Sequence, residues 1–239
     1  MQNASSLDVE ENGRGEERDV ANELWQRLVA LDDIRLTSIY PRGTVVLAQA
    51  QRAEGIYLLR AGRAKVSLSS AEGRVIILNV VHPGAVLGVN AALRGSTYDA
   101  SVETLERSRI DFIPRSDFLR VIDESNATRA SLTLFLAGEV SDLVESMRSL
   151  LLSQSAAERL AGLLLRWRNG HRSAVTNLNP GLTHEEIAQM IGASRETVTR
   201  LFADFRRRQI VSFSNNTMVV NDLRALESLA GINNDLLVM

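Results

Sequence analysis

The spacing of apolar residues divides the chain into a strand-rich stretch and a helical stretch. Between residues 34 and 113, short runs of β-forming residues recur about every ten positions, and glycine appears in most of the turns between them. Short strands at such regular spacing favour a roll, sandwich or barrel. Residues 55–81 are expected to form two successive hairpins. The predicted strands are Thr44–Leu47, Gly55–Arg60, Ala64–Leu68, Val75–Val81, Ser101–Glu103 and Ser108–Ile113.

Helical spacing takes over after Pro114. Ser116 is expected to cap a short helix, and a longer helical pattern follows from about Thr128 to Leu152. Six apolar residues of the longer helix lie three or four positions apart, near the heptad repeat of a coiled coil. They are Leu132, Leu136, Val140, Leu143, Met147 and Leu150. This stripe predicts either a dimer seam or a helix packed on its own roll, and its length of nearly three heptads favours the dimer.

Four further apolar residues lie beside this stripe and are expected to face the roll. They are Leu134, Phe135, Val144 and Leu151. A polar break follows and predicts a hinge, then a helix from Ala157 to Trp167 and a loop from Asn169 to Asn179.

The stretch from Gly181 to Gln209 predicts two short helices joined by a tight turn. Thr183 and Glu186 have the spacing of a capping box at the start of the first helix. Gly192 suits a left-handed turn, and Ser194 is expected to cap the second helix. Apolar residues from both helices close the seam between them, namely Ile187, Ile191, Val198 and Leu201.

The second of these helices carries a polar row opposite its apolar face. Arg195, Glu196, Thr199 and Arg200 recur at i, i+1, i+4 and i+5, so they project together into solvent. Such a row of hydrogen-bonding side chains fits the ~12 Å-wide major groove of DNA. The pattern predicts a helix-turn-helix, although an ordinary helical hairpin with a solvated face has the same spacing.

A β-hairpin is expected directly after the second helix. Its strands are Ile210–Phe213 and Met218–Val220, with a polar turn between them. A hairpin in this position makes a winged helix-turn-helix, and a short helix follows it.

The amino-acid composition limits which classes of protein this chain can belong to. The chain has 239 residues, 45% of them hydrophobic, enough for one large or two modest domains. It has no cysteine, which excludes disulfides and cysteine-bound zinc or iron–sulfur clusters. No run of about 18 apolar residues is present, so we expect a soluble cytoplasmic protein with no membrane contact. From Gly192 to Ile210, five arginines face two acids, although the whole chain has a net charge of −2.

Together these patterns predict an α+β chain in four parts. Residues 1–20 form a disordered acidic tail, and residues 21–126 form a roll of the double-stranded β-helix or jelly-roll type. Residues 127–153 are a dimerisation helix with its hinge, and residues 154–239 are the winged helix-turn-helix domain.

This order of roll, long helix and winged helix-turn-helix resembles the CRP/FNR family of bacterial transcription regulators, from about Leu36 to Ala230. The most specific match is the sequence Gly192-Ala193-Ser194-Arg195-Glu196-Thr197-Val198. The resemblance implies a cyclic-nucleotide-binding-like sensor domain and a homodimer on a palindromic TGTGA-like site in double-stranded DNA. RNA polymerase is then an expected partner. Activator and repressor roles are both compatible with it.

The same resemblance assigns roles to the residues of the second helix. Arg195 and Arg200 would contact guanine and Glu196 would accept from cytosine, which agrees with the chemistry of those side chains. Thr199 would tune the next base. The residues better placed for phosphate contacts are Thr183, His184 and Ser194. Arg206, with the two arginines after it, is either a further phosphate contact or part of a solvated helix end.

The resemblance fails in the ligand pocket, whose candidate residues are Gly88, Val89, Tyr98, Asp99, Val144 and Glu145. Cyclic-AMP-binding members carry a Glu at the position of Val89 and Arg-Ser at the positions of Tyr98 and Asp99. A carboxylate repels a phosphate, so cyclic AMP is not the expected effector. Nearby Arg94 is either a site for another anion or an ordinary surface residue. An unidentified ligand and a purely structural roll both stay open.

Other cofactors and activities lack support in the sequence. Haem would need an axial ligand such as His82, which precedes Pro83-Gly84 in a turn, and the three histidines are too far apart to suggest a metal site. No nucleophile elbow, P-loop or cysteine nucleophile is present, so no catalytic residues are predicted. The alternative is a ligand-binding module whose winged helix contacts proteins.

Overall fold

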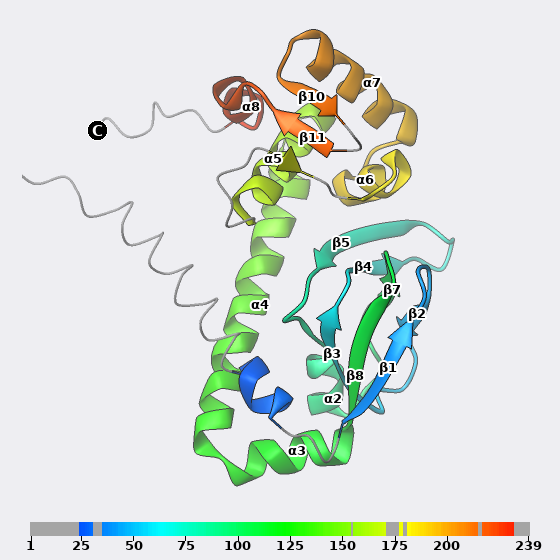
Figure 1. Cartoon of the computed structure of the whole chain (residues 1–239), viewed down its shortest axis with the longest axis vertical. Coiled ribbons are helices and arrows are strands. Elements are labelled where there is room, and N and C mark those ends of the chain that lie inside the picture. The colour runs from blue at the N-terminus through cyan, green and yellow to red at the C-terminus, as the bar shows by residue number, and fades with distance from the viewer. Residues whose placement is uncertain are drawn as a thin grey trace, which may run out of the picture. The chain divides into compact units, whose positions relative to one another are not determined.

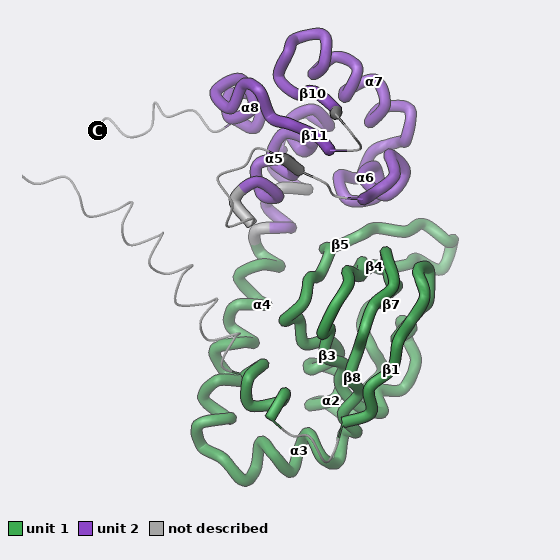
Figure 2. Tube along the Cα trace, viewed as in Figure 1, with its two compact units in different colours: residues 1–144 green, residues 145–239 purple. Residues whose placement is uncertain are grey.

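The structure is a computed structural model in which the described residues are 24–30, 35–153, 155–170, 177–178, 181–214 and 217–231. The predicted acidic tail at residues 1–20 lies outside them. The chain forms two compact units, residues 1–144 and 145–239 (Figure 2). No helix among the described residues is both long enough and apolar enough to span a membrane.

The first unit is built on two four-stranded antiparallel sheets, which together form the roll (Figure 1). The strand orders are β1-β8-β3-β6 and β2-β7-β4-β5. The strands are β1 Leu36–Tyr40, β2 Val45–Leu47, β3 Gly55–Ala61, β4 Ala64–Ser69, β5 Val75–Val81, β6 Val86–Leu87, β7 Ser101–Thr104 and β8 Ser108–Pro114. The predicted fold class of this part is confirmed, while β1 and β6 were not predicted.

The first of the two predicted hairpins is wrong because the chain crosses between sheets there. Strand β3 pairs with β6 and β8, whereas β4 pairs with β5 and β7. Gly62 lies in the crossing with a φ of 88°, and a Cβ on it would lie 2.3 Å from Ser108 Oγ. Only glycine fits both this left-handed backbone and this close approach. The second hairpin, β4–β5, is confirmed.

Strand β3 is buried on both faces. Ile56 and Leu58 pack in a cluster with helical residues such as Phe118, and Tyr57 between them packs with residues from both sheets. This alternation follows from the two-residue period of a strand. The cluster around Tyr57 contains Leu47, Ala53, Ala64, Leu87, Ala91, Tyr98 and Val102. One strand therefore joins the interior of the roll to the layer beneath its helices.

A buried carboxylate ties three neighbouring strands together. Asp111 on β8 accepts hydrogen bonds from Arg35 Nη1 at 2.7 Å, Arg60 Nη1 at 3.2 Å and Thr37 Oγ1 at 2.7 Å. Its side chain is almost inaccessible to solvent. A buried charge is tolerated only when it is paired in this way, so this cluster is part of the framework of the roll.

Two helices were predicted from the sequence, namely α3 (Arg115–Glu124) and α4 (Asn126–Leu152). Helix α2 (Val89–Arg94) was not predicted, and residues 24–29 also form helix. The N-cap of α3 is Pro114, and Ser116 lies inside the first turn without a capping bond. Proline suits this position because the first helical turn does not need its missing N–H.

The predicted dimer seam on α4 is wrong at its N-terminal end. Leu132 is only 6% exposed and packs in the core cluster that contains Phe118 and Ile122. Phe135 and Leu136 are partly buried against the same cluster. Heptad spacing does not distinguish a partner helix from the chain's own roll, and here the roll covers the first part of the stripe.

The later part of the stripe is exposed in the single chain. Val140, Leu143 and Met147 are 60%, 52% and 50% exposed. Val144 and Leu151, which were expected to face the roll, are also exposed. At about 100° per residue, these five side chains lie on one side of α4. The side chain of Leu150 lies outside the described residues.

The second unit packs helices against a small antiparallel sheet of order β10-β11-β9. Its elements are α5 Ala156–Gly170, β9 Asn177–Leu178, α6 His184–Ile191, α7 Arg195–Arg207, β10 Val211–Ser214, β11 Thr217–Val220 and α8 Leu223–Leu229. The core includes Leu160, Leu164, Ile187, Val198, Phe202, Phe205, Met218 and Leu226. Strand β9 corrects the predicted loop, because Asn177 and Leu178 pair with β11.

Candidate nucleic-acid interface

Local hydrogen bonds fix the turn between α6 and α7. Thr183 Oγ1 accepts from the Glu186 amide at 3.2 Å, and the Thr183 amide donates to Glu186 Oε2 at 2.8 Å, so the predicted capping box is confirmed. Gly192 ends α6 in the left-handed region with φ 59° and ψ 48°. Ser194 Oγ then accepts from the Thr197 amide at 3.1 Å and caps α7. The left-handed Gly192 and the Ser194 cap set the direction in which α7 leaves the turn, and the capping box fixes the start of α6.

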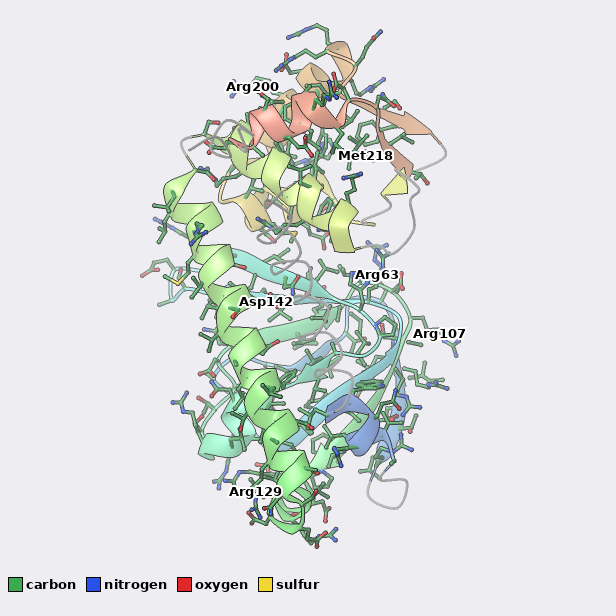
Figure 3. All side chains as sticks on the ribbon, turned by 90° about the vertical axis from the view of Figure 1, so that its left-hand side faces the viewer. Arg63, Arg107, Arg129, Asp142, Arg200 and Met218 are labelled. Atoms are coloured by element: carbon green, nitrogen blue, oxygen red, sulfur yellow. The ribbon has the colours of Figure 1, made fainter. Side chains whose placement is uncertain are left out.

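Helix α7 separates its apolar and polar residues onto opposite faces. Val198, Phe202 and Phe205 are buried in the core of the unit. The predicted polar row of Arg195, Glu196, Thr199 and Arg200 is exposed, and Arg200 is labelled among the side chains in Figure 3. Among the described residues, neither Arg195 nor Arg200 forms an ion pair. Their guanidinium donors therefore face solvent and are available to a ligand.

A contact between the two helices was not predicted. His184, the first residue of α6, lies with Nδ1 2.9 Å from Thr199 Oγ1 on α7. The imidazole ring stacks on Phe202 at a centroid distance of 5.2 Å and an interplanar angle of 24°. These residues are far apart in sequence and on different helices, so no periodic pattern links them. Their meeting depends on how the two helices cross.

The arginines at the end of α7 divide into two environments. Arg207 forms an ion pair with Asp204, and Arg208 Nη1 lies 3.7 Å from the same carboxylate. Arg206 lies over the exposed ring of Phe213 on β10, 6.0 Å from its centroid. The structure therefore places Arg206 against the wing, whose tip, at residues 215–216, lies outside the described residues.

In the roll, Tyr98 of the predicted pocket is a buried core residue. Tyr98 is 3% exposed, and its hydroxyl donates to the Gly55 carbonyl at 2.8 Å. A Cβ on Gly88 would lie 2.8 Å from the Tyr98 ring, so the ring packs directly on that glycine. Burial raises the pKa of Tyr98 and also that of Tyr57, whose ring centroid lies 6.4 Å away.

Polar groups beside Tyr98 satisfy one another. Asp99 accepts from Asn90 Nδ2 at 2.8 Å and lies 3.7 Å from Arg94 Nη1. Arg94 thus has a carboxylate partner. Val89 is buried, as a hydrophobic residue in this position would be.

The structure brings together only part of the predicted pocket. Gly88, Val89, Tyr98 and Asp99 lie close to one another, whereas Val144 is exposed on α4. The side chain of Glu145 lies outside the described residues, as does His171. No cluster of three potential metal ligands occurs among the described residues.

Two family models match the chain, each on one of the regions described. The cyclic nucleotide-binding domain matches residues 38–125, which cover the roll, and the Crp-like helix-turn-helix domain matches residues 158–229. The chain belongs to the CRP/FNR family of transcription regulators. It is therefore a DNA-binding regulator whose two characteristic domains are both present.

Curated CRP/FNR relatives align over most of their length. The CRP-like cAMP-activated global transcriptional regulator of Mycobacterium tuberculosis is 25% identical over 190 residues, covering 78% of this chain and 84% of that protein. The cyclic AMP receptor protein of Thermus thermophilus is 26% identical over 195 residues, covering 80% and 87%. These relatives are transcription regulators.

Solved structures of CRP/FNR proteins share the fold. FixK2 from Bradyrhizobium japonicum has a TM-score of 0.74 at 21% identity, covering 82% of this chain and 97% of that one. The c-di-GMP responsive regulator CLP of Xanthomonas campestris has a TM-score of 0.68 at 17% identity, covering 84% and 99%.

Proposed function

We propose that this CRP/FNR regulator binds DNA as a homodimer on a palindromic TGTGA-like site. One α7 helix would enter each of two successive major grooves, about 34 Å apart. The observation that carries the proposal is the exposed row of Arg195, Glu196, Thr199 and Arg200 on α7. This row lies opposite a fully packed apolar face, so the helix keeps its shape while its polar side chains contact the bases.

Three residues of the row each have a base that suits them. Arg195 and Arg200 donate to the O6 and N7 acceptors of guanine, and Glu196 accepts from the N4 amine of cytosine. Each well-formed bidentate pair contributes about 1–3 kcal/mol of discrimination against the wrong base. The absence of competing ion pairs at both arginines among the described residues supports this assignment.

A second set of residues would fix the register through phosphates. Thr183 and Ser194 cap the two helices, and His184 and Arg206 lie at the start of α6 and the end of α7. Contacts from such positions orient the protein on the duplex without reading sequence. Their loss should weaken specific and non-specific binding alike.

Dimerisation would use the exposed face of α4. Val140, Leu143 and Met147 have heptad-like spacing, and Val144 and Leu151 widen the same face. A second copy of the helix would cover these side chains symmetrically. The two-fold axis of that pairing would match the two-fold symmetry of the operator.

Cyclic AMP is not the proposed effector, in contrast to the relatives whose names describe them as cAMP-activated. The support is chemical, because Tyr98 occupies the space beside Gly88 and the neighbouring Asp99 is anionic. Any effector of this chain would have to displace the Tyr98 ring or bind elsewhere. RNA polymerase is the proposed partner at the promoter, as for a regulator of this family.

Fluorescence anisotropy on a labelled palindrome tests DNA reading. The full chain should prefer a TGTGA-type palindrome to a scrambled duplex, and Arg195→Ala or Arg200→Ala should weaken that binding by about 5- to 150-fold per half-site, the equivalent of 1–3 kcal/mol for each lost pair. Arg224→Ala removes the same charge from an exposed position on α8 and serves as the matched control. Equal affinity of the wild type for both duplexes would refute the proposal and favour a protein-binding role for the wing.

A further inference from the structure

The hydroxyl group of Thr199 is already engaged inside the protein, although the side chain lies on the exposed row of α7. Oγ1 lies 2.9 Å from the Arg195 carbonyl oxygen, to which it can donate, and 2.9 Å from His184 Nδ1. A threonine hydroxyl has one proton to donate. Both contacts therefore compete with any base for the same polar group.

Either histidine tautomer keeps that proton within the protein. If Nδ1 carries the ring proton, it donates to Oγ1, and the hydroxyl donates to the Arg195 carbonyl. If Nδ1 is unprotonated, it accepts the hydroxyl proton itself. In both cases Thr199 cannot donate to a base acceptor such as guanine N7 without breaking an internal bond. The hydroxyl oxygen keeps a lone pair that can accept, whereas the methyl group makes neither of these bonds and is open to an apolar contact.

The position of His184 is fixed independently of DNA. Its ring stacks on Phe202, which is buried in the core of the unit, and its backbone begins α6 directly after the Thr183 cap. The histidine thus holds Thr199 from across the helix crossing. It is placed to orient a neighbouring side chain in addition to any contact it makes with phosphate.

We propose that Thr199 reads the methyl group of a thymine in each half-site, and that His184 is the positioning residue that makes this possible. An apolar contact with the C5 methyl of thymine is one of the ways in which a threonine distinguishes base pairs in the major groove. The inference rests on the proposed entry of α7 into that groove. It makes Thr199 a specificity-determining residue whose hydroxyl proton serves the protein instead of the DNA.

Replacing thymine with deoxyuridine tests this contact, because the exchange removes only the methyl group. Each thymine of the palindrome is replaced in turn, in both half-sites together, and affinity is measured by anisotropy for the full chain. One such replacement should weaken wild-type binding by about 3- to 5-fold per half-site, the value of one buried methyl group, or about 10- to 25-fold for the dimer.

Variants of the two residues assign the effect. Thr199→Ser keeps the hydroxyl and loses the methyl, so the deoxyuridine penalty should disappear, whereas Thr199→Val keeps a methyl and should retain it. His184→Phe keeps an aromatic ring against Phe202 but has no ring nitrogen. It should reduce the deoxyuridine penalty when residue 199 is threonine, but not when it is combined with Thr199→Val. The deoxyuridine penalty is a ratio of two affinities of the same variant, so a change in folding stability does not alter it. A histidine with a merely structural role would therefore change the stability and leave the penalty unchanged.

Specific binding with the same deoxyuridine penalties in wild type and Thr199→Ser would overturn this inference and leave the proposed function intact. A penalty unaffected by His184→Phe would overturn the positioning role. No preference for the palindrome over scrambled DNA would overturn both proposals.

Discussion

Replacing Leu143 with glutamate should convert the proposed dimer into monomers. Leu143 is 52% exposed in the single chain, and Val140 and Met147 beside it on the same stripe are 60% and 50% exposed. Complete burial of such a side chain contributes about 1.5–3 kcal/mol, so covering the exposed half of six side chains gives roughly 5–9 kcal/mol. Association itself costs about 4–15 kcal/mol, so the seam has little surplus stability.

Glutamate at position 143 removes two leucines from the seam and places two carboxylates across its two-fold axis. The lost burial alone is about 1.5–3 kcal/mol, and the like charges add to it. We therefore expect the dissociation constant of the dimer to rise by at least about 100-fold. Sedimentation velocity over a concentration series measures this constant, and circular dichroism verifies that the helix content is unchanged.

Leu134→Glu provides a closely matched control. Leu134 is on the same helix and has the same exposed fraction of 52%, but it lies nine residues earlier, about 180° around the helix axis. It should leave the dimer intact. The reasoning about the seam is refuted if both variants dissociate equally, or if Leu143→Glu remains a dimer at the concentrations where the wild type does.

Three further outcomes test the framework and the roll. Asp111→Asn should lower the free energy of unfolding, measured in urea, by about 3–5 kcal/mol, because Arg35 and Arg60 lose their buried partner. The control Glu106→Gln breaks a partly exposed ion pair with Arg63 and should lower it by under about 1 kcal/mol. Similar losses for both would contradict the framework role. Calorimetric titration with cyclic AMP should give no binding, and a micromolar dissociation constant would contradict the account of Tyr98. Burial raises the pKa of Tyr57 and Tyr98, so the unfolded chain releases these protons at a lower pH than the folded chain. The free energy of unfolding should therefore fall as the pH rises above about 10, and it should fall less steeply in Tyr98→Phe. Identical slopes in the two proteins would contradict this role of Tyr98.

Features that depend on neighbouring residues were predictable from the sequence. The capping box of Thr183 and Glu186, the turn at Gly192 and the cap at Ser194 all use residues within four positions of one another. The exposure of the polar row on α7 follows from helical periodicity in the same way. Its role in base reading stays a prediction.

Features that depend on distant residues were not predictable in the same way. The sequence pattern of two successive strands is the same whether they pair in a hairpin or belong to different sheets. The crossing between sheets at Gly62 was therefore not predicted. The stripe on α4 has one period throughout, yet Leu132 packs on the roll while Leu143 is exposed. The link between His184 and Thr199 arises from a helix crossing, and single-sequence patterns carry no signal for it.

The separation of faces on α7 also bears on how such regulators diversify. None of Arg195, Glu196 and Arg200 belongs to the buried core. Under the proposed base reading, mutations at these positions would change the preferred operator without a loss of folding stability, and new regulatory targets would be accessible by single substitutions. Thr199 differs from these three residues, because its hydroxyl contacts His184 on α6 and a substitution there also alters a contact between the two helices.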